Sequence, residues 1–418
     1  MAGWTGRRDR DGERAMPAAL DGVTVLDLSE WIAGPYASKL FADAGADVIK
    51  VERPGGDPSR GVGPFAGGTP HREKSGTFFY FNTGKRSVVL DLKQPAARDA
   101  FLRLVDGADI VLESFRPGVL DRLGVGWERI HARKPEIALV SLAPFGQDSP
   151  YRDYKLTDLT LFGMCGEMYS MGVAEAEPMK MYGTAALVQC GAAAAAAAMG
   201  ALTVSETQGL GQHVDLALAD LQFTGTDRRH AAQIGNQFSG RKSLRASGGG
   251  AFLILGGVYH CADGYVLFVS ANQHLDRVRA MLGHPAWLAD PKWEDPALQF
   301  DPDVIGEFDA YFMPWCLDRT KREIWALARE HRVLCGPLFT VEELYADEHF
   351  RGRGLFTALD HADVGRVEVP GRAVLMGATP WRISRPAPRL GEHTREVLGE
   401  AGLDGGEVEA LIATGAAS

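Results

Sequence analysis

The sequence contains little cysteine and no paired cysteine motif. Its five cysteines include no CxxC pair, so they indicate neither a disulfide framework nor the ligand spacing of a zinc site. The N-terminal segment also lacks the apolar core of about 7 to 15 residues that a signal peptide needs. We therefore expect a cytoplasmic protein with no bound metal, in which residues 1–18 form a disordered tail.

Two nucleotide-binding signatures are also absent. The segment DLSEWIAGPYAS, which follows the first predicted strand, contains Gly34 but no GxGxxG pattern, and no GxxxxGK[ST] sequence occurs. These absences disfavour NAD, FAD and P-loop nucleotide binding. A net charge of −10 also argues against nucleic acid and anionic membrane as partners, because both require a positive surface.

A long uncharged stretch runs from Met181 to Ser205 and includes seven consecutive alanines. It is only weakly hydrophobic for a membrane span, because it consists largely of Ala and Gly and contains Gln189 near its middle. Alanine is the best helix former, and small side chains let neighbouring backbones approach closely. The stretch therefore predicts a buried, close-packed helix.

From Val23 onward, short β-branched runs alternate with helical patterns. This alternation predicts βαβ units and a parallel sheet covered on both faces, hence a Rossmann-like α/β fold. The predicted strands lie in the segments VTVLDL, ADVIKVE, RSVVLDL, ADIVLESF, EIALVSL and GQHVDL. We expect a large domain at 19–223, a linker at 224–250, a smaller α+β domain at 251–333 and a return to the large domain at 334–418.

Basic residues of the first half lie near the ends of predicted strands or the starts of helices. In doubly wound sheets that edge binds ligands, and helix N-termini there favour phosphate. The pattern thus indicates a phosphate-bearing ligand, although solvated surface charges remain the alternative. The residues are Lys50, Arg53, Arg60, Lys85, Arg86, Lys93, Arg116 and Arg122.

Several phrases together resemble the family III CoA-transferases, the group that includes formyl-CoA transferase, carnitine CoA-transferase and α-methylacyl-CoA racemase. They are LDGVTVLDLSEWIAGPYASKLFADAGADVIKVERPGGDPSR, FNTGKRSVVLDLK, ADIVLESFRPGVLDRLGVGWERI, ETQGLGQHVDLALAD, CADGYV and RPAPRLGEHTREVL. The resemblance covers about Leu20 to Glu400. It implies a Rossmann-like large domain built from both chain ends, a small domain, and two subunits that interlock.

The resemblance also implies a ligand, coenzyme A or an acyl-CoA, bound as substrate. Matched motif by motif, the residues that would contact its adenine and phosphates are Ala33, Arg53, Leu90, Lys93, Phe115 and Arg122. A glycine-rich loop, Gly248, Gly249 and Gly250, would cover the reacting centre, because consecutive glycines permit close backbone approach. A flexible linker is the other interpretation of this loop.

The family nucleophile is missing. In the family, an Asp four residues before a Gly attacks the thioester. With Gly191 as anchor that position falls at about Leu187, and no Asp occurs between Asp158 and Asp215. The racemase branch adds a His, for which Thr157 stands here, so we interpret Asp158 as structural.

Three hypotheses follow from this gap. The first is a subunit of a hetero-oligomeric CoA-transferase, inactive alone, whose related sister subunit supplies the Asp; two-subunit members of the family act on aromatic dicarboxylates such as benzylsuccinate. The second is a non-catalytic scaffold that binds CoA or acyl-CoA. The third is an acyl-CoA isomerase or lyase that uses another carboxylate, for which Glu167 is a candidate.

Overall fold

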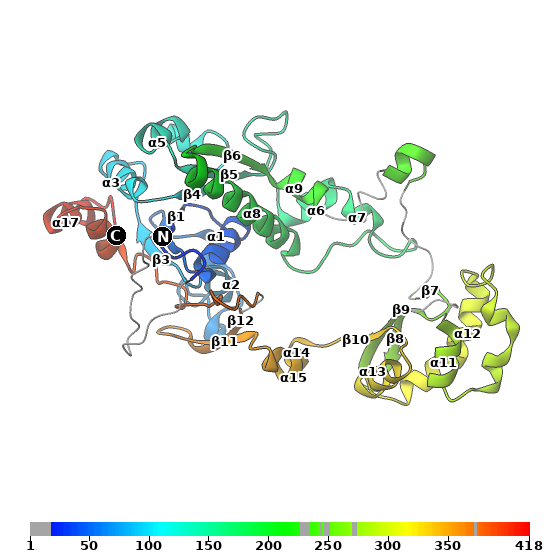
Figure 1. Cartoon of the computed structure of the whole chain (residues 1–418). Coiled ribbons are helices and arrows are strands. Elements are labelled where there is room, and N and C mark those ends of the chain that lie inside the picture. Colours follow the sequence, from blue (N-terminus) through cyan, green and yellow to red (C-terminus); the bar gives the residue numbers. More distant parts are fainter. Residues whose placement is uncertain (1–17, 226–233, 243–244, 246–250, 270–273, 372–373) are drawn as a thin grey trace. The chain divides into compact units, whose positions relative to one another are not determined.

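The computed structural model describes residues 18–225, 234–242, 245, 251–269, 274–371 and 374–418 (Figure 1). The first 17 residues of the expected tail lie outside this part of the chain, as do Gly248, Gly249 and Gly250 of the expected lid loop. The predictions for those two segments therefore stay predictions.

The chain divides into two compact units. The first contains the described residues of Met1–Met168, Lys180–Arg241 and Gly352–Ser418, so it is built from both ends of the chain. The second contains those of Tyr169–Met179 and Lys242–Arg351. It extends beyond the boundary expected at 333, because the strand Cys335–Pro337 pairs with an earlier strand of the same unit.

The first unit is organised around a six-stranded sheet in which all neighbouring strands are parallel. Its strands are β1 (Thr24–Asp27), β2 (Asp47–Glu52), β3 (Arg86–Val89), β4 (Ile110–Glu113), β5 (Ala138–Ala143) and β6 (Gln212–Ala217). Their order, β3-β2-β1-β4-β5-β6, is that of a doubly wound Rossmann sheet. The predicted fold class is thus confirmed.

Helices cover both faces of this sheet. Successive residues of a strand point to opposite faces, and accordingly Val25 and Leu26 belong to different hydrophobic clusters. One face packs against α1 (Ala33–Asp43) and α8 (Ala185–Gln208). The other packs against α3 (Pro95–Asp106), α5 (Trp127–Arg133), α16 (Thr394–Glu400) and α17 (Gly405–Ala413), so the C-terminal segment completes the core (Figure 1).

Helix α8 is the predicted alanine-rich helix. By length and composition alone it is the one described helix that could cross a membrane. In this fold α8 instead packs mainly against α1, and also against β5, β6 and α9 (Leu218–Thr224). A Cβ added to Gly191 would overlap the backbone oxygen of Ala33, so glycine is what allows the two helices to approach this closely.

The first unit also contains short elements around the sheet. They are α2 (Gly76–Phe81), α4 (Val119–Arg122), α6 (Asp158–Met164), α9 (Leu218–Thr224) and the hairpin β11 (Phe356–His361) and β12 (Gly365–Pro370), together with the 3-10 turns Pro58–Gly61 and Ala66–Gly68. The short helix α7 (Glu167–Ser170) starts in this unit and ends in the other. The hairpin packs on α2 through Phe78, Phe79, Leu359 and Val369.

The second unit is an α+β structure, as expected. Its antiparallel sheet has the order β10-β9-β8-β7, from β7 (Ala251–Leu253), β8 (Gly256–Cys261), β9 (Gly264–Val269) and β10 (Cys335–Pro337). Its helices are α11 (Leu275–Met281), α12 (Pro302–Leu317), α13 (Lys321–Glu330), α14 (Val341–Ala346) and α15 (Glu348–Gly352). An aromatic core of Tyr259, Phe268, Trp293, Phe308 and Phe312 holds the sheet and α12 together.

Candidate functional site

A cavity of about 460 Å³ opens at the carboxyl edge of the parallel sheet. Its walls are formed where β1, β2, β3 and β4 end, which in doubly wound sheets is the edge that binds ligands. The lining residues are Leu28, Ser29, Glu30, Lys50, Val51, Glu52, Arg53, Pro54, Asp57, Leu90, Asp91, Leu92, Lys93, Phe115, Val119 and Leu123.

Four of the residues predicted to bind the ligand meet in this cavity: Arg53, Leu90, Lys93 and Phe115. Two others do not line it. Ala33 is buried at the start of α1, whereas Arg122 is exposed at the end of α4, beside lining residues of the same turn. The fold thus brings together positions from three βα turns, and their contact with a ligand stays a prediction.

Two cations of the cavity are available to an anion. Arg53 is largely exposed, and its Nε lies 3.1 Å from Oε1 of Glu30 and 3.3 Å from the carbonyl oxygen of Gly56. The two terminal nitrogens of Arg53 donate no hydrogen bond within the described part of the chain. Lys93 is exposed, and its ammonium group likewise contacts no acid among the described residues.

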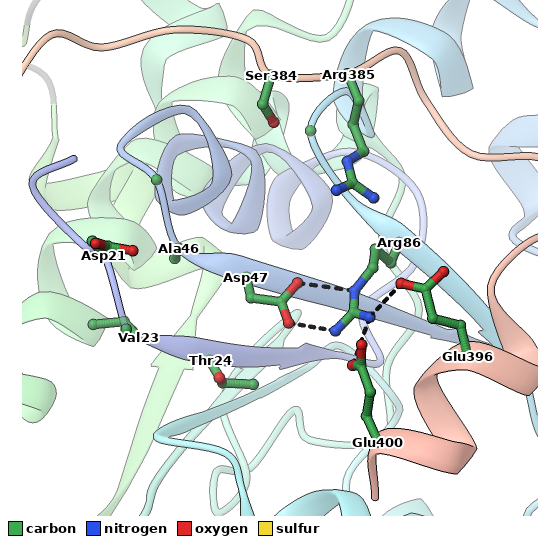
Figure 2. Close-up of a pocket in the computed structure, with 13 residues that line it drawn as sticks. Asp21, Val23, Thr24, Ala46, Asp47, Arg86, Ser384, Arg385, Glu396 and Glu400 are labelled. Atoms are coloured by element: carbon green, nitrogen blue, oxygen red, sulfur yellow. Dashed lines mark hydrogen bonds and ion pairs between the residues drawn. The ribbon is translucent and has the colours of Figure 1, made fainter. Parts of the chain in front are cut away.

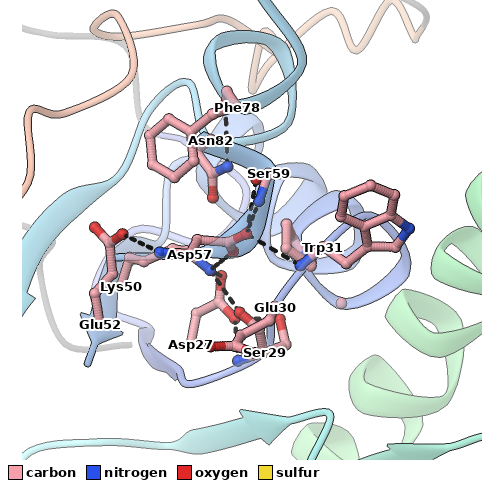
Figure 3. A network of polar contacts seen from close by, with 12 residues as sticks. Asp27, Ser29, Glu30, Trp31, Lys50, Glu52, Asp57, Ser59, Phe78 and Asn82 are labelled. Atoms are coloured by element: carbon pink, nitrogen blue, oxygen red, sulfur yellow. Dashed lines mark hydrogen bonds and ion pairs between the residues drawn. The ribbon is translucent and has the colours of Figure 1, made fainter. Parts of the chain in front are cut away.

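Lys50 and Lys85, near the same edge, are buried and paired, which corrects the expectation that they face a ligand, whereas Arg116 and Arg122 are exposed. Nζ of Lys50 lies 2.8 Å from Oδ2 of Asp57 and 3.9 Å from Oδ2 of Asp27, and it donates to the carbonyl of Ser29 at 2.5 Å (Figure 3). Lys85 donates to Asp27 at 2.9 Å. Lys50, which lines the cavity, and Lys85, which does not, are therefore structural charges.

In this network, the attraction between opposite charges offsets the desolvation that disfavours buried charged groups. Burial alone would raise the pKa of Asp27, but the ammonium groups of Lys50 and Lys85 outweigh it and hold that pKa well below its usual range. Burial lowers the pKa of Lys85 to about 8, in part offset by Asp27. For Lys50 the neighbouring carboxylates outweigh burial, so its pKa is raised. Lys50 and Asp27 are consequently charged at neutral pH.

Two acids of the network hold the loops that form the cavity wall. Asp57 accepts hydrogen bonds from the backbone N–H of Ser59 at 2.8 Å and of Trp31 at 3.2 Å (Figure 3). Trp31 has a φ of 76°, a left-handed conformation that is rare outside glycine and that its surroundings must enforce. Glu52 binds Arg60 through two hydrogen bonds of 2.8 Å each, so Arg60 is also a structural cation.

The position predicted for the family nucleophile, at about Leu187, lies close to this edge. Leu187 is 6% exposed near the start of α8 and belongs to the same buried cluster as Ile32 and Ala33. Gly191, one helical turn later on the same face, contacts the backbone of Ala33. Leu187 thus packs beside the β1–α1 turn, whose earlier residues line the cavity, and it contributes only hydrocarbon.

Neither of the other acids considered lines the cavity. Asp158 forms an ion pair of 2.7 Å with Lys180, and Thr157 caps α6 by accepting a hydrogen bond from the backbone of Thr160. Glu167 is buried at the start of α7. Within the described residues, no group of three or more His, Cys, Asp or Glu side chains is arranged to hold a metal ion.

A second cavity, of about 520 Å³, lies at the opposite, amino edge of the sheet (Figure 2). Arg86, at the start of β3, is nearly buried there and binds Asp47, Glu396 at 2.9 Å and Glu400 at 2.7 Å. Since these acids surround its guanidinium group, Arg86 fixes α16 to the sheet and is not a ligand-binding cation, contrary to the grouping made from the sequence.

The fold and the cavity define the class of this protein. A doubly wound sheet with a cation-bearing pocket at its carboxyl edge is the arrangement of proteins that bind nucleotide-like, phosphate-bearing ligands. The comparison with known families is more specific: a family model described as CoA-transferase family III matches residues 20–394. The chain belongs to this family of CoA-transferases.

Characterised relatives align with nearly the whole chain. The BbsE subunit of succinyl-CoA:(R)-benzylsuccinate CoA-transferase from Thauera aromatica is 32% identical over 394 residues, which cover 92% of this chain and 94% of that protein. The succinate–glutarate CoA-transferase of Agrobacterium fabrum is 33% identical over 392 residues, 91% of this chain and 95% of that protein. A crystal structure of a CAIB/BAIF family protein from Brucella suis superposes with a TM-score of 0.81, at 26% identity, over 92% of this chain and 100% of that one.

Sequence reasoning missed Glu30 and the buried ion pairs of the cavity floor. One signal for the pairs was present: in VIKVE, a lysine and a glutamate interrupt a strand that a parallel sheet buries on both faces. Charges at such positions require buried partners of opposite sign. Glu30 gave no such signal, because its proximity to Arg53 depends on how two loops fold.

Proposed function

We propose that this chain is a subunit of a heteromeric CoA-transferase, and that a related subunit supplies the Asp nucleophile. The observation that carries the proposal is the combination of a cation-bearing cavity with a leucine at the nucleophile position. One relative is named as a subunit of a benzylsuccinate enzyme, which supports a two-subunit assembly. The interlocking of the subunits stays a prediction.

The transfer would proceed in the balanced steps of carboxylate catalysis. The sister subunit's carboxylate attacks the thioester carbonyl of an acyl-CoA, forming a mixed anhydride and releasing the CoA thiolate. The thiolate then attacks the aspartyl carbonyl of the anhydride, giving an enzyme-CoA thioester and the free acid. An acceptor carboxylate repeats the two steps in reverse, and succinyl-CoA as donor is supported by the name of the benzylsuccinate relative.

Within this scheme the described residues bind and orient the coenzyme. Arg53 and Lys93 would contact its phosphates, because their nitrogens face no acid that neutralises them completely. Leu90 and Phe115 would flank the adenine. The backbone N–H of Phe115 donates to Glu113 at 2.6 Å, which fixes this part of the wall. The loop Gly248 to Gly250 would cover the reacting centre.

The test begins with the chain alone and continues with its partner. The isolated chain is expected to bind CoA in calorimetry but to catalyse no transfer from succinyl-CoA to a carboxylic acid such as benzylsuccinate. Co-expression with a related, Asp-bearing chain of similar length should yield a stable complex with transferase activity. Asp→Asn in the sister chain should abolish that activity and the hydroxylamine-sensitive covalent CoA adduct.

The alternatives give different results in the same assays. Full transferase activity of this chain alone would contradict the proposal. CoA binding without turnover in any complex would favour a scaffold. If Glu167→Gln in this chain abolished turnover while Asp→Asn in the sister chain left turnover unchanged, an isomerase or lyase that uses the buried Glu167 would be favoured.

A further inference from the structure

We propose that Glu30 sets the affinity of the carboxyl-edge cavity for phosphate-bearing ligands by keeping a negative charge beside Arg53. The inference rests on the CoA site proposed above and assigns to Glu30 a role in specificity. It predicts that the native site binds the coenzyme less tightly than its cations alone would allow.

The position of Glu30 is fixed by the fold. The residue follows β1, and its backbone N–H donates to the Ser114 hydroxyl, just after β4, at 2.8 Å. Its side chain is 31% exposed and lines the cavity, with Oε1 3.1 Å from Nε of Arg53. The carboxylate therefore lies inside the site, next to a cation predicted to receive the ligand.

The geometry lets a phosphate bind without displacing Glu30. The carboxylate approaches Arg53 most closely at Nε, which also donates to the carbonyl oxygen of Gly56, while the terminal nitrogens of Arg53 donate no hydrogen bond among the described residues. A phosphate bound to those terminal nitrogens would place two anions on one guanidinium group. Their repulsion is therefore present in the complex and lowers its affinity.

The remaining charges of the wall do not mask this effect. Lys50 is neutralised by Asp57 and Asp27, and Glu52 by Arg60, all as buried pairs. Asp91 accepts hydrogen bonds from the backbone N–H of Lys93 at 3.2 Å and from Gln94 at 3.3 Å. The groups that then decide the charge of the cavity are Arg53 and Lys93 against Glu30 and Asp91. Neutralising Glu30 would leave the cavity with a net positive charge.

The electrostatic surroundings make Glu30 a tunable charge. Burial raises the pKa of Glu30. Arg53 and Lys50 oppose that shift, whereas Asp57 and Glu52 reinforce it. A moderate affinity for the coenzyme suits a transferase, because the coenzyme must leave as a new thioester in every cycle. Tighter binding of the substrate and product thioesters would slow this release without accelerating the chemical step.

The experiment compares Glu30→Gln with the native chain by calorimetry. Gln keeps the size and the hydrogen-bond acceptor but removes the charge. The matched control is Glu128→Gln, which removes a charge from an exposed position of α5, away from the cavity lining. The ligands are CoA, dephospho-CoA and pantetheine, each measured at low and high salt.

We expect Glu30→Gln to bind CoA about fourfold more tightly at low salt, which corresponds to two unit charges about 5 Å apart at the dielectric constant of water, about 80. The gain should shrink at high salt, be absent for pantetheine and be absent in the control. If Glu30→Gln also binds dephospho-CoA more tightly than the native chain does, the pyrophosphate is the group that faces Glu30.

Two results would overturn the inference, and they are distinguishable. If the native chain binds CoA and Glu30→Gln binds it equally or more weakly, Glu30 does not limit affinity, while the proposed CoA site stands. If neither protein binds CoA although both are folded by circular dichroism, the proposed site itself is wrong, and the role of Glu30 with it.

Discussion

Replacement of Glu113 by Gln is expected to stabilise the protein at alkaline pH. Glu113 ends β4 and is 3% exposed. Its Oε2 accepts the backbone N–H of Phe115 at 2.6 Å, and it is hydrogen-bonded to Ser141 of β5. Oγ of Ser141 lies 2.9 Å from Nε2 of His213. A Gln amide can accept from Phe115 and donate to Ser141, so the chain of hydrogen bonds is retained without the charge.

The magnitude follows from the pKa of the carboxyl group. Burial raises the pKa of Glu113 from 4.5 to about 7, against the opposing effect of its hydrogen bonds. The folded state thus holds the proton more tightly than the unfolded chain does. Stability from this group is full below pH 4.5 and is lost as the pH rises towards 7, because the carboxylate must then be charged while buried. The loss is about 3 kcal/mol at pH 8 and about 1 kcal/mol at pH 5.

The assay is urea unfolding of the native chain and of Glu113→Gln at pH 5 and pH 8. It can be followed by tryptophan fluorescence, since Trp127 stacks on His213 at a ring distance of 5.8 Å. The variant should gain about 2 kcal/mol more at pH 8 than at pH 5. A Glu113→Gln variant that is less stable than the native chain at pH 8 would refute the reasoning. So would a difference in the free energy of unfolding between the two proteins that is the same at pH 5 and pH 8. Glu128→Gln is again the control, because its side chain is exposed.

Three further predictions test the packing and the charges of the site. Gly191→Ala should lower the free energy of unfolding by about 2 to 4 kcal/mol in urea titrations, because its methyl group would overlap the carbonyl oxygen of Ala33; an unchanged midpoint would show that α8 can shift freely. Lys50→Met should cost about 3 to 5 kcal/mol in the same assay, because it leaves the buried Asp57 carboxylate unpaired, whereas a neutral result would mean that water reaches the network. Dephospho-CoA, which has no phosphate titrating near neutrality, should bind the native chain more tightly as the pH falls towards the raised pKa of Glu30, and calorimetry of Glu30→Gln should show no such trend.

The sheet and the cavity were predictable for a common reason. Short segments rich in β-branched residues, such as RSVV and IVLE, form strands buried on both faces, and their alternation with helical patterns predicts a parallel order. The carboxyl ends of parallel strands then meet at one edge. Positions in the turns after β2, β3 and β4 therefore converge, which is why Arg53, Lys93 and Phe115 line one cavity.

The roles of the other cations were not predictable from spacing. Lys50 and Arg86 both lie in strands near charged turns, yet Lys50 is enclosed by Asp27 and Asp57, and Arg86 lies at the opposite edge among acids from α16. Which acid meets which base depends on side-chain direction and on a helix more than three hundred residues away in the sequence. Hydrophobic periodicity carries no information on such pairings.

The packing around Leu187 bears on the proposal that another subunit supplies the nucleophile. The Leu187 side chain belongs to an apolar cluster that includes Ile32, Ala33 and Cys190. Gly191 of α8 lies so close to Ala33 of α1 that little space remains between these two helices. A carboxylate buried there would lose its hydration and have a raised pKa unless a partner group or water entered. Such a carboxylate would lower the free energy of unfolding, and we expect a protein to keep it only where it takes part in the reaction. Leucine at this position avoids that cost and leaves the cavity at the carboxyl edge open, which agrees with the proposal that another subunit supplies the reactive carboxylate.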